Sequence, residues 1–197
     1  MKKGNKKNQS ILVVYSSSGG STEGIARTIG QALASDADVT VVRLGRDRNG
    51  WPDPGDYGAV IAGSPIRYDE WMPEMRSFVE LHTASLATRP TAFFFSCLSL
   101  AAPDREGAGQ AGIYASKIRR LVPALRPVDV RGFAGTLRYS AVPFLLRIPF
   151  RVFMNGKGIS EGDYRDWSAI QEWANGILAP ALALREIRAA PGDLART

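Results

Sequence analysis

Residues 11–22 read ILVVYSSSGGST and decide the fold. The first five are apolar and rich in β-branched side chains, a pattern typical of a strand that is buried on both faces. Small hydroxyl-bearing residues and glycines follow, and Ile25, Ile29, Ala32 and Leu33 then recur at helical spacing. The stretch therefore predicts a strand, a polar loop and a helix that begins directly after the loop.

The same alternation of strands and helices continues along the chain. Further strands are predicted over residues 39–44, 59–63, 91–95 and 128–132, helices over residues 73–86, 113–122 and 164–184, and turns or loops over residues 45–57 and 96–112. Such alternation implies right-handed crossovers and a parallel sheet that carries helices on both faces. The predicted fold class is therefore α/β, a doubly wound sheet of five parallel strands with flavodoxin-like architecture.

Composition and charge limit the classes of function. The 197 residues are 45% apolar and 22% charged, as in soluble globular proteins. One cysteine, Cys97, excludes an internal disulfide, and one histidine, His82, argues against most zinc sites, so we expect no metal. A reducing cytoplasm is the expected compartment. No apolar run is long enough to span a membrane.

The positive charge is concentrated at the start of the chain. Four of the six lysines lie in residues 1–10, and without them the net charge of +6 falls to +2. We expect residues 1–9 to form a basic disordered tail, with contact to an anionic surface as the other interpretation. Residues 10–184 form the predicted domain, and residues 185–197 a C-terminal tail.

The loop after the first strand suits a phosphate group, because hydroxyls and backbone N–H groups meet the positive end of a helix dipole there. The loop contains no lysine or arginine, and it matches neither the nucleotide triphosphate loop nor the G-x-G-x-x-G dinucleotide motif. We therefore expect the monophosphate of FMN, with a serine-rich helix cap as the simpler alternative. The predicted phosphate-binding residues are Ser16, Ser17, Ser18, Gly19, Gly20, Ser21 and Thr22.

Two further loops are expected at the same edge of the sheet, where the strands over residues 59–63 and 91–95 end. Their predicted cofactor-binding residues are Ser64, Pro65, Ile66, Arg67 and Tyr68 in one loop and Ser96, Cys97, Leu98 and Ser99 in the other. Tyr68 or Trp71 is expected to stack on the flavin ring. Arg67 suits a negative charge on the flavin or a substrate carboxylate, or a plain ion pair with a neighbouring acid. The sequence offers no catalytic triad or carboxylate pair, so the chemistry must come from the cofactor.

Residues 138–154 combine apolar side chains with two arginines, Arg147 and Arg151, which one helical face would carry four residues apart. Two internal prolines break the segment, so it is unsuited to a spanning helix. It suits an interfacial segment or a lid over an apolar substrate, and an ordinary core helix is the alternative.

Several motifs together resemble one known family. They are YSSSGGST (15–22), GSPIRY (63–68), PTAFFFS (90–96), GTLRY (135–139) and the pair Asp166-Trp167. The combination resembles the flavodoxin-like, quinone-dependent protoporphyrinogen IX oxidases (dehydrogenases) of bacterial haem synthesis, over residues 10–178.

This resemblance implies an FMN enzyme that oxidises protoporphyrinogen IX, or a related tetrapyrrole, and passes electrons to menaquinone or another quinone. It implies contacts to substrate or flavin from Arg67, Tyr68 and Arg138, with Arg147 and Arg151 as further candidates for propionates or lipid phosphates. An anionic membrane surface and a second copy of the chain are expected partners, and nucleic acid is not. A flavodoxin-type electron carrier and an FMN-dependent NAD(P)H:quinone reductase are the alternative functions.

Overall fold

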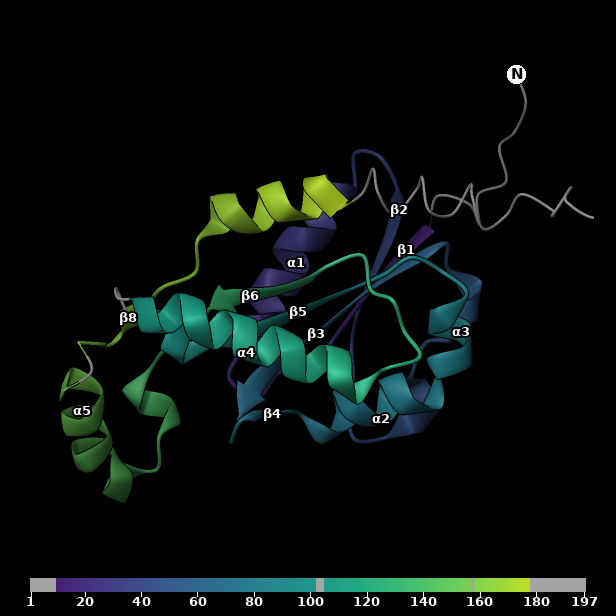
Figure 1. The fold of residues 1–197 in the computed structure, drawn as a ribbon. Helices are drawn as coiled ribbons and strands as arrows, with labels where there is room; N and C mark the ends of the chain where they lie inside the picture. The colour runs from purple at the N-terminus through teal and green to yellow at the C-terminus, as the bar shows by residue number, and fades with distance from the viewer. Residues whose placement is uncertain (1–9, 102–104, 157, 178–197) are drawn as a thin grey trace, which may run out of the picture.

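The computed structural model describes residues 10–101, 105–156 and 158–177 (Figure 1). The expected tails over residues 1–9 and 185–197 lie outside the described residues. Five parallel strands form the central sheet in the order β2-β1-β3-β5-β6. Their bounds are Ser10–Tyr15 for β1, Asp38–Arg43 for β2, Ala59–Arg67 for β3, Thr91–Cys97 for β5 and Val130–Ala134 for β6. The predicted fold class is confirmed.

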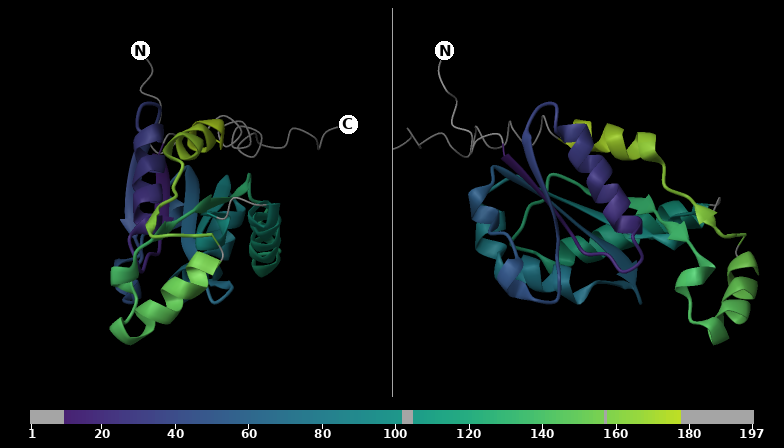
Figure 2. Two further views of the ribbon diagram at one scale, coloured as in Figure 1. Left: turned by 90° about the vertical axis from the view of Figure 1, so that its left-hand side faces the viewer. Right: turned by 180° about the vertical axis from the view of Figure 1, so that it is seen from behind.

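Helices cover both faces of the sheet (Figures 1 and 2). One face carries α1 (Ser21–Leu33) and a helix over residues 167–177. The other face carries α2 (Pro73–Leu81), α3 (Thr83–Ala87) and α4 (Arg105–Leu121). The chain therefore has the three-layer arrangement that parallel sheets need to bury both of their faces.

The strands divide the core into two layers by alternation of their side chains. Leu12 and Val14 face α2 and α4, whereas Ile11, Val13 and Tyr15 face α1 and the last described helix. The three consecutive phenylalanines of β5 follow the same rule, because Phe93 and Phe95 point to one layer and Phe94 to the other. All three are fully buried, which explains why the strand reads as a continuous apolar run.

Several boundaries differ from the predictions. The expected helix over residues 73–86 is interrupted at His82, where the Thr83 hydroxyl donates to the carbonyl of Val79 (2.8 Å) and competes with the helical ladder. The expected loop over residues 96–112 is wrong from Arg105 onward, because α4 begins there despite its glycines. The last described helix begins at residue 167 rather than 164, since the Asp166 carboxylate accepts the Ala169 N–H (3.0 Å) as its cap.

Three short strands were not predicted. β4 (Glu70–Trp71) pairs antiparallel with the end of β3, which therefore extends four residues beyond the predicted strand. β7 (Thr136–Leu137) and β8 (Gly162–Asp163) pair with each other. They enclose the segment that contains α5 (Arg147–Gly156), and this segment projects from the sheet (Figure 2).

Close packing at Gly63 gives a test of the core. A Cβ at Gly63 would overlap the ring of Phe94, which is fully buried. We expect Gly63→Ala to lower the free energy of unfolding by about 1–3 kcal/mol in urea titrations. Gly112→Ala is the matched control: its Cβ would meet open space on the exposed side of α4, and it should raise stability by about 0.5–1 kcal/mol. Equal effects of both substitutions would contradict the packing described.

Candidate functional site

Three loops meet at the carboxyl edge of the sheet and are joined by buried hydroxyl pairs. The Ser16 hydroxyl donates to Ser64 Oγ (3.0 Å), and the Thr22 and Ser96 hydroxyls are 2.8 Å apart. All four residues are buried. The structure thus brings together the three loops in which the sequence predicts cofactor-binding residues.

The first loop ends in an uncapped helix N-terminus. Gly20, the N-cap of α1, has φ +83° and no side chain caps the helix. Among the described residues, no acceptor is recorded for the backbone N–H groups of Ser18 and Gly19 or for those of Ser21, Thr22 and Glu23 at the start of α1. Such N–H groups, together with the helix dipole, suit an oxyanion. This observation fits the phosphate of FMN.

The hydroxyls of this loop fall into two groups. The Ser21 hydroxyl accepts the Thr136 N–H (2.7 Å) and pairs with the Thr136 hydroxyl, so it ties α1 to β7. Ser16 likewise ties the loop to Ser64. Ser17 Oγ accepts the Gly20 N–H (3.1 Å), which leaves its own proton to donate, and Thr22 shares its hydroxyl only with Ser96. Of the buried hydroxyls, Ser17 and Thr22 are therefore the ones able to donate to a phosphate, and the hydroxyl of Ser18 is exposed beside them.

Two arginines outside the loop add positive charge beside it. Arg43, at the end of β2, donates to the carbonyl of Ser17 (2.8 Å). The largely buried Arg165 lies against the first turn of α1, where a Cβ at Gly24 would overlap its guanidinium. Arg165 also donates to Asp163, and this hydrogen bond lowers the pKa of the Asp163 carboxyl. The loop itself lacks cations, but the fold supplies two from neighbouring elements.

The second loop is a tight hairpin with a strained tip. Arg67 and Glu70 pair across it, and the two residues between them, Tyr68 and Asp69, have φ values of +50° and +64°. Two-residue hairpins need this left-handed conformation and normally use glycine or asparagine for it. A bulky tyrosine there costs about 1–2 kcal/mol. Tyr68 is 94% exposed, so no packing in the described structure offsets this cost.

Asp69 and Tyr114 hold the hairpin against α4. The Tyr114 hydroxyl donates to the Asp69 carboxylate (2.5 Å). Burial and this hydrogen bond raise the pKa of Tyr114 to about 12, so the phenol stays protonated at neutral pH and remains a donor. Glu70 pairs with Arg76 (2.7 Å). Arg67 has no ion pair in the described part of the chain, and its guanidinium lies over the Tyr68 ring (5.9 Å).

The two aromatic residues considered for stacking have different surroundings. Trp71 is buried in the core against the edge of Phe93, with ring centroids 5.4 Å apart. Tyr68 is exposed at the hairpin tip. Of these two residues, Tyr68 is therefore the one positioned to cover a flat ligand at this edge of the sheet.

The third loop leads from β5 into a short turn, η4 (Leu98–Ala101). Cys97 and Ser99 are half-buried, and their Sγ and Oγ atoms are 2.8 Å apart. Leu98 packs with Leu137 and Met154 of the projecting segment. Arg138, directly after β7, is exposed and lies two residues from the Thr136 contact with the first loop. The projecting segment is thereby anchored beside the first and third loops of the predicted site.

Comparison with known proteins identifies the family. The sequence profile of the Flavodoxin domain family matches residues 12–162. The chain belongs to this family. Its membership supports the FMN that the sequence predicts, and the recognised resemblance is confirmed.

Two curated relatives within the flavodoxin domain family carry the same name. A protein of Leishmania major named protoporphyrinogen IX dehydrogenase [quinone] is 30% identical over 180 residues, which cover 88% of this chain and 76% of that protein. The protein of the same name from Escherichia coli strain K12 is 28% identical over 175 residues, covering 84% of this chain and 93% of that one.

Solved structures support the fold. An archaeal flavodoxin has a TM-score of 0.51 at 17% identity and covers 87% of this chain and 98% of its own. Flavodoxin 1 from Bacillus cereus has the same TM-score at 15% identity, with 86% and 97% covered. At these identities the similarity shows the fold alone.

Residues missed at the sequence level lie on neighbouring elements rather than in the loops. Arg43 could have been found, because it ends the strand that neighbours β1 in a flavodoxin-like sheet. Thr136, Arg165 and Tyr114 contact the loops from 45 to 144 residues away in sequence. Local sequence patterns do not predict contacts between residues so far apart in the chain. The roles of the predicted site residues remain predictions.

The uncapped helix N-terminus predicts the effect of removing one hydroxyl. We expect Thr22→Val to weaken FMN binding by about tenfold or more, because a hydrogen bond to a charged group is worth about 1.5–3 kcal/mol. Thr28→Val on the same helix is the matched control and should leave the affinity unchanged. Fluorescence titration of the apoprotein with FMN measures both. Unchanged affinity in Thr22→Val would place the phosphate elsewhere.

The strained tip of the hairpin predicts opposite effects on stability and binding. Asparagine tolerates the left-handed conformation, so Tyr68→Asn should keep or raise the free energy of unfolding of the apoprotein, by up to about 1 kcal/mol. FMN affinity should fall, since an aromatic contact worth about 0.5–1.5 kcal/mol is lost. Urea unfolding and flavin titration test the pair. A clear loss of stability would mean that Tyr68 is a structural residue.

Proposed function

We propose that the protein is an FMN-dependent dehydrogenase that oxidises protoporphyrinogen IX and uses a quinone as the electron acceptor. The uncapped, hydroxyl-lined N-terminus of α1 carries the FMN part of the proposal. The names of the curated relatives support the substrate and the acceptor.

The phosphate of FMN would be held by Ser17, Thr22 and the N–H groups of the first turn of α1, with Arg43 and Arg165 nearby. The flavin ring would lie between the hairpin tip and the third loop, with Tyr68 against it. When bound, FMN supplies the redox chemistry by which hydrogen removed from the porphyrinogen reduces the quinone to a quinol.

Arg67 is the side chain best placed to receive a substrate carboxylate. The acids that flank it are engaged elsewhere, Asp69 with Tyr114 and Glu70 with Arg76. An exposed guanidinium without an ion pair can form a bidentate contact with a carboxylate. Tyr68 beside it would shield the reacting edge of the substrate from water.

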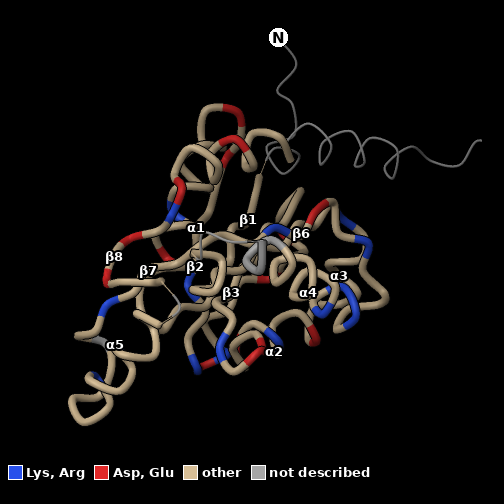
Figure 3. The backbone as a smooth tube through the Cα atoms, turned by 60° about the vertical axis from the view of Figure 1, so that its left-hand side comes forward, with Lys and Arg blue, Asp and Glu red and all other residues tan. Residues whose placement is uncertain are grey.

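The projecting segment supports an enzyme that meets apolar molecules. Its exposed large side chains are Phe144, Leu145, Leu146, Ile148, Val152 and Phe153. Figure 3 shows no acidic residue on α5, whose charged residues are the two arginines Arg147 and Arg151. An apolar surface with basic residues suits the interface of an anionic membrane, where quinones reside. Among the described residues, no helix is long and apolar enough to cross a bilayer.

Arg147 and Arg151 of this segment differ in whether the protein itself already uses their N–H donors. Arg147 donates to the carbonyls of Val142 (2.9 Å) and Ser140 (3.2 Å), so it stabilises the turn that precedes α5. Arg151 is exposed and lies over the ring of Tyr139 (5.8 Å). Of the two, Arg151 is therefore the one available to a lipid phosphate.

The proposed reaction predicts turnover without a partner protein. FMN-loaded protein, incubated anaerobically with protoporphyrinogen IX and a soluble quinone, should form fluorescent porphyrin and quinol together. Arg67→Ala should lower kcat/KM by about tenfold or more, the value of one charged hydrogen bond. Arg46→Ala is the exposed control outside the proposed site and should leave kcat/KM unchanged.

Two outcomes would contradict the proposal. If porphyrinogen leaves the flavin oxidised and only an added reductase reduces it, the protein is an electron carrier. If NAD(P)H alone supports quinone reduction and porphyrinogen does not, it is a quinone reductase.

The projecting segment predicts peripheral membrane binding. In vesicle co-sedimentation, wild type should bind anionic vesicles more than neutral ones, and added salt should reduce binding by screening. Leu145→Ser combined with Arg151→Glu should weaken binding, since Leu145 is 87% exposed and each basic residue contributes about 1 kcal/mol. Leu81→Ser, an exposed leucine on α2, is the control. Equal binding of the two variants would contradict membrane contact and leave the segment as a lid or a packed helix.

A further inference from the structure

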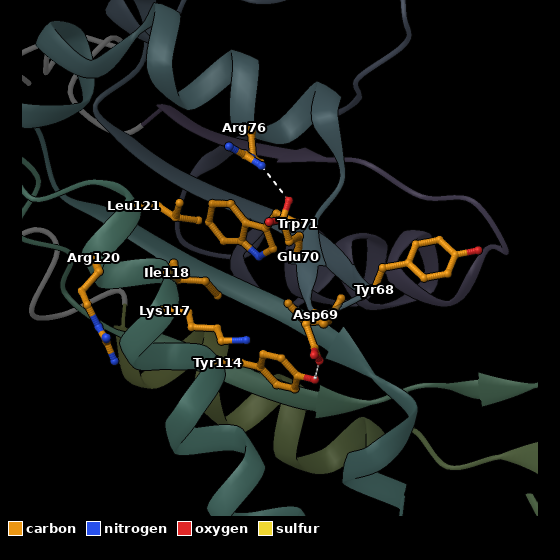
Figure 4. A pocket seen from close by; sticks show the side chains of 11 residues that line it. Tyr68, Asp69, Glu70, Trp71, Arg76, Tyr114, Lys117, Ile118, Arg120 and Leu121 are labelled. Atoms are coloured by element: carbon orange, nitrogen blue, oxygen red, sulfur yellow. Dashed lines mark hydrogen bonds and ion pairs between the residues drawn. The ribbon is translucent and has the colours of Figure 1, made fainter.

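A groove of about 330 Å³ lies between the β3–β4 hairpin and α4 (Figure 4). It shares Ile66 and Tyr68 with the predicted flavin site but contains no residue of the phosphate loop. Its apolar surface comes from Ile66 and Trp71 on one side and from Ile118 and Leu121 of α4 on the other. The groove therefore adjoins the proposed site without being part of it.

Trp71 contributes an unsatisfied donor to this groove. The residue is 3% exposed, and its Nε1 is buried with no hydrogen-bond acceptor. Figure 4 shows the indole nitrogen turned toward the part of the groove that Lys117 and Tyr114 border. An indole N–H removed from water normally finds a partner, and leaving it without one destabilises the fold. A ligand atom that accepts a hydrogen bond would satisfy it.

The charged residues around the groove favour an anion. Lys117, Arg120 and Arg76 contribute three cations, and Asp69 and Glu70 contribute two acids. Both acids already have partners, because Asp69 accepts a hydrogen bond from Tyr114 and Glu70 forms an ion pair with Arg76. Lys117 and Arg120 are exposed and form no ion pair in the described structure; Lys117 only lies over the Tyr114 ring (5.5 Å). Two cations therefore remain for a ligand.

We propose that this groove binds one carboxylate-bearing edge of an apolar ligand, with Trp71 Nε1 donating to an oxygen of the ligand and Lys117 and Arg120 pairing with one carboxylate, while Arg67 outside the groove is left for another. The identity of the occupant rests on the proposed function: it is the propionate-bearing edge of the tetrapyrrole. A volume of about 330 Å³ is at the lower end for ligand sites, so the groove holds one edge and leaves the rest of the macrocycle at Tyr68.

The test compares an acid with its ester in the absence of turnover. Protoporphyrin IX and its dimethyl ester are titrated into FMN-loaded protein, and binding is followed by porphyrin absorbance. The diacid should bind at least about tenfold more tightly than the diester, and Lys117→Ala with Arg120→Ala should clearly reduce that preference. Arg119→Ala, on the next position of α4 and near Asp129, is the matched control and should keep it.

A second pair of variants tests the indole donor. Trp71→Phe keeps an aromatic ring in the core but removes the N–H, and it should weaken binding of the diacid and the diester alike. Trp51→Phe is the matched control, because the Trp51 N–H donates to the carbonyl of Gly45 away from the groove. Since Lys117 and Arg120 are exposed, their double variant keeps the test valid even where Trp71→Phe fails to fold.

Failure of this inference is distinguishable from failure of the proposed function. Equal binding of acid and ester, or an unchanged preference for the acid in the Lys117 and Arg120 variant, would contradict carboxylate binding in the groove. Porphyrinogen turnover would still support the proposed function in that case. A small aryl carboxylate, 2-naphthoate, serves as a second ligand in the binding experiment. If it binds through the same residues while the porphyrin does not, the carboxylate site stands and the tetrapyrrole as its occupant is overturned.

Discussion

The parallel register of β1, β3 and β5 is the constraint on which the rest of the structure depends. Because these strands run in the same direction side by side, the loops that follow them must end at one edge of the sheet. The buried hydroxyl pairs Ser16–Ser64 and Thr22–Ser96 then fix those loops to one another. The pairs satisfy polar groups that would otherwise be buried without partners, so the same contacts that keep the edge stable also shape the site.

Stability and function are separated at the hairpin. The Ser64 hydroxyl accepts the Met72 N–H (3.0 Å), and Tyr114 holds Asp69, so the base and one side of the hairpin are well fixed. Tyr68 at the tip is strained and exposed. Strain that no packing contact offsets is typical of residues kept for binding. The rigid base therefore presents Tyr68 and Arg67 in a defined place.

The sequence was informative where the signal is local. The apolar run of β1, the glycine-serine loop and the spacing of α1 allowed the fold and the position of the phosphate loop to be predicted. Contacts across the chain could not be predicted in this way, as shown by Thr136 meeting Ser21 and by Arg165 meeting the first turn of α1. The glycines of α4 misled the helix assignment, because packing of Tyr114 and Ile118 against the sheet outweighs their low propensity.

Amide chemical shifts in ¹⁵N-labelled protein, recorded during titration with FMN, test the central claim most directly. If the three loops hold the cofactor, the largest shifts fall on the N–H groups of residues 18–23, with further shifts at the hairpin tip and in residues 96–99. Saturable shifts confined to another edge of the sheet, with the amides of residues 18–23 unmoved, would contradict the account.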